Sequence, residues 1–228
     1  MANAKAICFD LDDTLWPAGP AIAAGEIALD HWITERCPRV SRRHDVASLR
    51  AHRQSLKVEF PSRKHDCGFL HLESLRRVLS EDGYPTELAE EGYAAFRDQR
   101  NRVQLFDDVL PALQRLAQNF RLFSVSNGDA CLATIGIGHL FEYSIEPVEA
   151  GGYKPDPAPW RHVLARAALD ANEVVHVGDD PHADVQGARD MGMHAVWIDR
   201  FQRPWPDALP RPASRVGCLN ELCELLSP

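Results

Sequence analysis

The chain has 228 residues, of which 45% are hydrophobic and 25% charged, and its formal net charge is −8. This length suits one large α/β domain or a domain with an insertion, and the mild acidity argues against nucleic acid as a partner. No apolar run approaches the roughly 20 residues of a membrane-spanning helix, and no signal peptide precedes the first apolar run. The six scattered cysteines favour reduced thiols over disulfides. We therefore expect a cytoplasmic protein, monomeric or homodimeric, that binds neither nucleic acid nor membranes.

The first predicted element is a strand over residues 6–9. This short apolar run contains β-branched and aromatic residues, as buried strands of parallel sheets do, and it stops abruptly at three carboxylates and a hydroxyl. Asp10, Asp12 and Thr14 then lie at the carboxyl end of the strand, where open α/β sheets bind ligands. Neighbouring carboxylates repel one another and burial raises their pKa values. A divalent cation would relieve both effects, and oxygen ligands suit Mg²⁺; the alternative is a solvated acidic turn.

Residues 17–103 show helical periodicity and no strand pattern. Pro38 and the segment 61–68, which is rich in helix breakers, divide this stretch. The helices are predicted over 20–35, 42–58, 69–80 and 87–100. An all-helical insertion therefore separates the first strand from the rest of its sheet.

From residue 104 onward, strands alternate with helices. Strands are predicted over 120–126, 143–147, 174–177, 193–198 and 215–216. Helices are predicted over 107–118, 157–169, 182–191 and 218–226. This alternation is typical of a Rossmann-like, doubly wound parallel sheet. We predict an α/β catalytic core formed by residues 1–16 and 104–228 and a helical cap formed by residues 17–103.

Polar side chains follow several of the predicted strands. They are Asp10, Asp12, Thr14, Ser126, Asn127, Lys154, Asp179 and Asp184. The carboxyl ends of parallel strands lie along one edge of a sheet, so these groups should converge. A carboxylate can attack phosphorus, Mg²⁺ shields its charge, and a lysine and a hydroxyl can hold the transferring oxygens. With a second carboxylate to move protons, the set predicts phosphoryl transfer through an aspartyl phosphate.

Four segments resemble the motifs of the haloacid dehalogenase superfamily of phosphohydrolases. They are Asp10-Leu-Asp12-Asp-Thr14, Ser126-Asn127-Gly128, Lys154-Pro155 and Gly178-Asp179-Asp-Pro-His-Ala-Asp184. All four occur in the right order, and together they cover the predicted core from end to end. The resemblance implies a Mg²⁺-dependent phosphatase with a helical cap inserted after the first motif.

The resemblance implies a role for each residue of the first motif. Asp10 would be the nucleophile and a Mg²⁺ ligand. Asp12 would be the general acid/base and would coordinate the metal through its main-chain carbonyl. Thr14 would fix Asp12 and the turn that follows, next to the substrate. The carboxylate at Asp12 also favours a phosphate ester, since the dehalogenase branch displaces halide and needs no proton for the leaving group.

The resemblance implies roles for the later motifs as well. Ser126 and the amide of Asn127 would bind the phosphate. Lys154 would neutralise the nucleophile and the phosphoryl intermediate and contact the substrate. Asp179 would ligate the metal, and Asp184 would support the metal site.

A narrower resemblance concerns the substrate. Residues 175–189 and 136–142 are similar to the bacterial branch that dephosphorylates FMN and the phosphoribitylamino-uracil intermediate of riboflavin synthesis. The similarity is weaker in the cap, which determines substrate specificity. The alternatives of the same class are a sugar-phosphate phosphatase and a phosphoglycolate phosphatase.

The predicted cap is basic. Residues 36–77 carry eleven Lys/Arg against four acids, which would attract an anionic substrate, although most are expected on ordinary solvated helix faces. In the loop 62–68, Arg63, His65 and Asp66 are candidate substrate contacts. Trp16, where the cap begins, either stacks on an aromatic substrate or packs the hinge against the core.

Two hypotheses of other classes remain. A receiver-type phospho-acceptor module also combines acids, a hydroxyl and a lysine on a parallel sheet, but such modules are much shorter and lack a helical insertion. An interaction-only relative would be expected to have lost some of these polar residues. The sequence therefore predicts a Mg²⁺-dependent phosphatase of a small phosphorylated metabolite.

Overall fold

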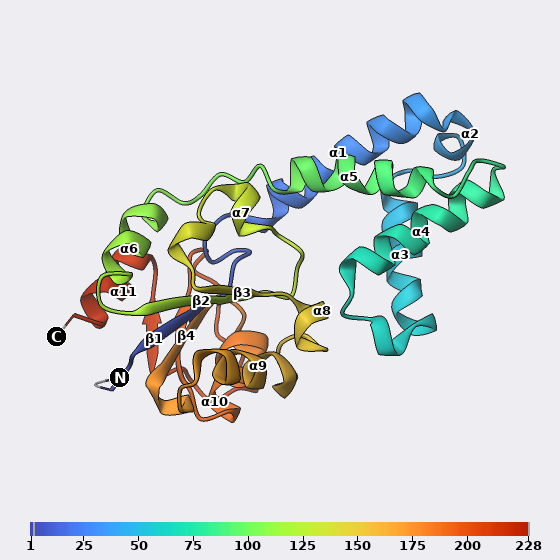
Figure 1. Cartoon of the computed structure of the whole chain (residues 1–228). Helices are drawn as coiled ribbons and strands as arrows, with labels where there is room; N and C mark the ends of the chain where they lie inside the picture. The colour runs from blue at the N-terminus through green and yellow to red at the C-terminus, as the bar shows by residue number, and fades with distance from the viewer. Residues whose placement is uncertain (2, 228) are drawn as a thin grey trace. The chain divides into compact units, whose positions relative to one another are not determined.

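The computed structural model describes residues 1 and 3–227. The chain divides into two compact units, which are described separately (Figure 1). The core unit contains Met1–Pro17 and Gln104–Pro228, and the helical unit contains Ala18–Val103. None of the described helices combines the length and the apolar character needed to cross a membrane.

The core unit is built on a six-stranded sheet with the order β3-β2-β1-β4-β5-β6, in which every neighbouring pair is parallel. The strands are β1 (Ala6–Phe9), β2 (Arg121–Val125), β3 (Tyr143–Ile145), β4 (Val174–Gly178), β5 (His194–Ile198) and β6 (Ser214–Val216). The central strand β1 is buried at every position because sheet neighbours and helices surround it. Phe9 pairs with Ser124 of β2 and with Val177 of β4, so the residues that follow these three strands come together. The predicted parallel α/β fold is confirmed.

Helices cover both faces of the sheet (Figure 1). They are α6 (Val109–Leu116), α7 (Leu132–Ile135), α8 (Pro147–Ala150), α9 (Pro157–Ala167), α10 (Gly187–Asp190) and α11 (Leu219–Leu225). Figure 1 shows α9 and α10 on one face and α6 with α11 on the other. Side chains alternate along a strand, so Ala6 and Cys8 pack in one cluster with Trp160 and Val163 of α9.

The helical unit consists of α1 (Ala18–Arg36), α2 (Pro38–Ser41), α3 (Val46–Glu59), α4 (Cys67–Glu81) and α5 (Leu88–Arg100). Helices α1 and α5 pack closely because glycines lie where they meet. A Cβ atom on Gly25 would lie 2.9 Å from the Phe96 ring, and one on Gly92 would lie 2.9 Å from the Trp32 ring. Asp45 and Asp66 accept backbone hydrogen bonds at the starts of α3 and α4, as N-cap residues do.

One predicted helix, over residues 182–191, differs in form. The chain after β4 makes a π-helical turn over Pro181–Gln186 before α10 begins. Asp180 caps this turn by accepting hydrogen bonds from the backbone N–H groups of His182 and Ala183. The wider turn brings Asp184 back beneath the end of β4, where its Oδ2 accepts a bond of 2.9 Å from the N–H of Asp180.

Candidate active site

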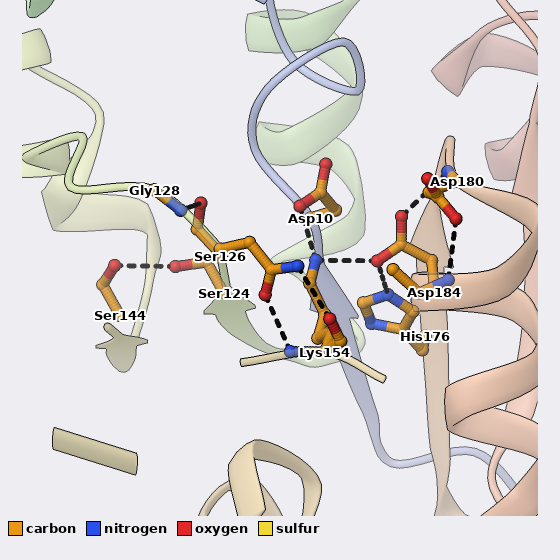
Figure 2. A network of polar contacts seen from close by, with 11 residues as sticks. Asp10, Ser124, Ser126, Gly128, Ser144, Lys154, His176, Asp180 and Asp184 are labelled. Carbon is orange, nitrogen blue, oxygen red and sulfur yellow. Dashed lines mark hydrogen bonds and ion pairs between the residues drawn. The ribbon is translucent and has the colours of Figure 1, made fainter. Parts of the chain in front are cut away.

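A buried lysine joins two carboxylates at the edge of the sheet. Lys154 Nζ lies 2.5 Å from Oδ1 of Asp10, the first residue after β1, and 2.7 Å from Oδ1 of Asp184. All three side chains are buried. Figure 2 shows the ammonium group between the two carboxylates. Since a buried charge is costly without a partner, these contacts hold together three segments that lie far apart in the sequence.

Asn127 positions the backbone of Lys154. The side-chain Nδ2 of Asn127 donates to the carbonyl of Lys154 at 2.9 Å, and its Oδ1 accepts from the N–H of Lys154 at 2.7 Å. Ser126 precedes it at the end of β2, and its Oγ accepts from the N–H of Gly128 at 3.0 Å. The sequence had suggested phosphate binding for Asn127. It did not reveal that the Asn127 side chain hydrogen-bonds the backbone of Lys154, because no local pattern connects residues 27 positions apart.

Three carboxylates form a candidate metal centre. Oxygens of Asp10, Asp179 and Asp184 all lie within 4.8 Å of one another. Burial raises the pKa of Asp10 well above its usual value, and the charges of Asp184 and Asp179 add to this although Lys154 opposes it. Burial and the charge of Asp184 raise the pKa of Asp179 to about 6, against the effect of Arg203. The neighbouring cations therefore leave negative charge uncompensated, and an oxygen site with excess negative charge fits Mg²⁺.

Lys154 and Asp184 are held in their charged forms. Burial alone would lower the pKa of Lys154, but the charges of Asp10 and Asp184 outweigh burial and raise it. Burial would raise the pKa of Asp184, but Lys154 and His176 outweigh it and lower that pKa. His176 Nε2 lies 3.0 Å from Oδ1 of Asp184, and burial lowers the pKa of the imidazole, so the neutral ring donates this bond. Both oxygens of Asp184 are thus engaged by the protein, which suits a supporting role.

Arg203 is a residue of the site that sequence analysis missed. Its guanidinium lies 2.5 Å from Oδ2 of Asp179, and its backbone N–H donates to Oδ1 of Asp199 at 2.8 Å. It belongs to the irregular segment between β5 and β6. Neither periodicity nor a motif marks an arginine in such a segment, so only the three-dimensional structure reveals the contact with Asp179.

Gly178 lies so close to the carboxylate of Asp184 that there is no room for a side chain at this position. A Cβ atom at this position would lie 2.3 Å from Cγ of Asp184, so Gly178→Ala must displace the carboxylate that binds Lys154. We expect the variant to lose about 1–3 kcal/mol of stability, as overpacked cores do, together with most of its activity. Urea unfolding and turnover measure the two effects. In the control Gly217→Ala, the atom nearest to the added Cβ lies at 3.6 Å, so stability and turnover should match those of wild type. Wild-type stability and turnover in Gly178→Ala would contradict the packing argument.

The turn after Asp10 is held by Trp16. The indole Nε1 of Trp16 donates to Oδ1 of Asp12 at 2.8 Å, and the indole is buried. Thr14 had been expected to fix Asp12, but its buried hydroxyl forms no hydrogen bond with any residue that the structure describes. Of the two possibilities for Trp16, the structure shows packing within the protein.

The candidate substrate contacts of the helical unit interact with one another. Arg63 lies 2.6 Å from Oδ2 of Asp66, and its guanidinium stacks 3.6 Å from the centre of the Phe69 ring. Asp66 Oδ1 accepts from the N–H of Phe69 at 2.8 Å and so caps α4. His65 lies beside them and is partly buried. These contacts give Arg63 and Asp66 a structural role, and substrate contact by the three residues stays a prediction.

Many of the basic residues of the helical unit form ion pairs within that unit. The pairs are Arg36–Glu91, Arg43–Asp82, Arg50–Glu26, Arg53–Glu26, Arg76–Glu90 and Arg77–Glu59. Since their charge is largely compensated locally, the excess of Lys/Arg over residues 36–77 reflects ordinary helix surfaces more than an anion-binding face.

Comparisons with known proteins agree with this geometry. Residues 4–192 match the family model of haloacid dehalogenase-like hydrolases. The chain is 28% identical to 5-amino-6-(5-phospho-D-ribitylamino)uracil phosphatase YigB of Escherichia coli over 87% of this chain and 84% of that protein. It is 35% identical to phosphoserine phosphatase of Thermus thermophilus over 64% of this chain and 61% of that protein. The solved structure of a 2-haloacid dehalogenase from Pseudomonas syringae is 37% identical, with a TM-score of 0.92 and 98% of each chain covered.

The chain therefore belongs to the haloacid dehalogenase-like hydrolase family. This confirms the resemblance drawn from the four motifs and removes the receiver-type alternative. The curated relatives named above are phosphatases, whereas the solved structure bears the name of a dehalogenase.

Proposed function

We propose that the protein is a Mg²⁺-dependent phosphatase that hydrolyses a small phosphorylated metabolite through an aspartyl-phosphate intermediate. The observation that carries the proposal is the buried Lys154 between Asp10 and Asp184 at the carboxyl edge of the sheet. A nucleophilic carboxylate beside a fixed cation suits attack on an anionic phosphoryl group, because the cation offsets the repulsion between the two.

Asp10 attacks phosphorus, and the bond from phosphorus to the leaving oxygen breaks. Lys154 stabilises the transferring oxygens, while Ser126 and the backbone amide of Asn127 hold the phosphate at the end of β2. Asp12 donates a proton to the leaving oxygen and then removes one from the water that hydrolyses the intermediate.

Mg²⁺ would be held by Asp10, Asp179 and the main-chain carbonyl of Asp12, with Asp184 in support. When bound, it would reduce the repulsion between the nucleophile and the phosphate. Burial, together with the charges of the neighbouring carboxylates, raises the pKa values of Asp10 and Asp179, and a bound cation would offset both effects, which supports this assignment.

The proposed substrate is FMN or the phosphoribitylamino-uracil intermediate of riboflavin synthesis. The support is the similarity to the Escherichia coli phosphatase over most of both chains and the resemblance of residues 175–189. The helical unit would act as the cap that selects the substrate and excludes water. A sugar-phosphate or phosphoglycolate substrate is the alternative within the same mechanism.

Dehalogenation is a second candidate, favoured by the 37% identity to the structure named as a 2-haloacid dehalogenase. The carboxylate of Asp12 distinguishes the two reactions. Halide leaves without a proton, whereas the alcohol of a phosphate ester needs one.

The test is product release from FMN, phosphoglycolate, a sugar phosphate, p-nitrophenyl phosphate and 2-chloropropionate, with Mg²⁺ or with EDTA. We expect phosphate release that stops in EDTA and returns when Mg²⁺ is restored, with the highest kcat/KM for FMN or its biosynthetic relative. Chloride release without phosphate release would overturn the phosphatase proposal. Phosphate release with no preference for the flavin substrates would retain the mechanism and reject the substrate.

A further inference from the structure

The carboxylate of Asp12 is anchored by an indole. The chain turns back on itself so that the N–H of Asp13 donates to the carbonyl of Trp16 at 2.8 Å. The turn places the Trp16 Nε1–H 2.8 Å from Oδ1 of Asp12. Asp13 lies in the left-handed region with a φ of 58°, a conformation that aspartate tolerates better than most residues. The turn and the indole bond thus belong to one local structure.

The remainder of the turn is fastened to the core unit. Arg200 Nε donates to the carbonyl of Thr14 at 2.7 Å, and the same guanidinium binds both carboxylate oxygens of Asp108. The N–H of Phe106 donates to the carbonyl of Leu15 at 3.1 Å. These bonds leave Trp16 little freedom to move, so its N–H is a fixed donor toward Asp12.

We propose that Trp16 is a positioning residue for proton transfer by Asp12. This inference rests on the proposed function and adds a residue to it. The indole N–H keeps Oδ1 as a hydrogen-bond acceptor, so the transferable proton resides on Oδ2. As the bond from phosphorus to the leaving oxygen breaks, the proton passes from Oδ2 to that oxygen, and Asp12 becomes a carboxylate. The indole bond then persists while Asp12 takes a proton from the attacking water.

The consequence is that the catalytic effect of losing the Trp16 bond depends on the leaving group of the substrate. An alkoxide is a poor leaving group and needs the proton, whereas p-nitrophenolate leaves without one. General-acid catalysis contributes about 10²–10⁴-fold to such steps. Imperfect positioning should therefore cost a part of that factor for alkyl phosphates alone in kcat/KM, which reports only the steps up to departure of the leaving group, whereas the later water step is common to both substrates. A merely structural role of Trp16 would affect both classes of substrate equally.

The experiment compares kcat/KM for an alkyl phosphate and for p-nitrophenyl phosphate in wild type and Trp16→Phe. Phenylalanine keeps an aromatic ring and removes the N–H donor. We expect kcat/KM for the alkyl phosphate to fall by about tenfold or more, with kcat/KM for p-nitrophenyl phosphate nearly unchanged. The control is Trp205→Phe, which removes the indole bond to the carbonyl of Leu209 and should leave the ratio of the two kcat/KM values as in wild type.

Two further measurements keep the inference falsifiable. If Trp16→Phe does not fold, replacing Trp16 with benzothienylalanine keeps both rings and removes only the N–H. In an Asp12→Asn background, Trp16→Phe should cause no further change in the ratio of the two kcat/KM values, because coupled residues are not additive. An equal loss of kcat/KM for both substrates, or a persistent effect in that background, overturns the role of Trp16 while wild-type turnover upholds the phosphatase. A wild type that releases no phosphate from either substrate overturns both.

Discussion

Replacing Asp10 with asparagine is expected to abolish phosphate release, with kcat falling by about 10⁴-fold or more, as when other enzymes lose their nucleophile. The amide keeps the shape of the side chain but cannot form the phosphoryl bond. The measurement is single-turnover and steady-state phosphate release at saturating Mg²⁺. The matched control is Asp207→Asn, which changes an exposed carboxylate that is not among the three clustered carboxylates. This control should keep nearly wild-type turnover.

The same variant separates catalysis from stability. Asp10 is one of three neighbouring carboxylates, and Lys154 keeps its bond to Asp184 when Asp10 is neutral. Removing a repelling charge should leave the metal-free variant at least as stable as wild type, which thermal unfolding in EDTA measures. If Asp10→Asn is inactive because it has unfolded, its loss of turnover is no evidence for the nucleophile. If Asp10→Asn is folded and active, Asp10 is not the nucleophile.

Lys154→Met is expected to have the largest effect on stability. Methionine approximates the length of lysine but leaves Asp10 and Asp184 buried without their shared cation. Breaking a buried ion pair in this way typically costs about 3–5 kcal/mol, which urea unfolding measures. Because Lys154 holds the pKa of Asp184 below its usual value, the stabilisation is complete above the ordinary aspartate pKa and is lost as the pH falls further. The deficit should therefore be largest at neutral pH and shrink in acid.

The response to metal tests the same variant independently. Mg²⁺ should raise the unfolding temperature of Lys154→Met more than that of wild type, since the cation replaces part of the missing charge. The control is Lys5→Met, which removes an exposed lysine that pairs with Glu173 at 2.5 Å and should cost at most about 1 kcal/mol. Equal stability losses in the two variants, or no Mg²⁺ response, would contradict the proposed charge balance.

Periodicity and strand ends in the sequence predicted most of the fold. The run over residues 6–9 is strand β1, and Asp10, Lys154, Asp179 and Asp184 meet where parallel strands end. These predictions succeeded because a buried strand has a distinctive local pattern and because parallel topology forces its neighbours' ends together.

The contacts that orient the site could not be predicted in the same way. Asn127 hydrogen-bonds the backbone of Lys154, 27 residues later in the chain. Arg203 pairs with Asp179 from an irregular segment. Arg200 donates to the carbonyl of Thr14, which lies 186 positions away in the sequence. Each depends on where a long side chain ends in space, which no period encodes. Trp16 lies only four residues from Asp12, yet the bond requires the left-handed turn at Asp13, which the sequence alone did not specify.

The sheet order has a consequence for how the chain acquires its structure. The central strand β1 is synthesised first but pairs with β2 and β4, which begin at Arg121 and Val174. Chain closure over such separations is entropically costly and slows folding. The helices of residues 18–103 instead pack mainly on one another, so they can form before β2 and β4 are available to pair with β1. Nascent chains should therefore acquire this helical structure well before the carboxylates and Lys154 come together, and the exposed apolar edge of β1 would be a target for chaperones until β4 has emerged.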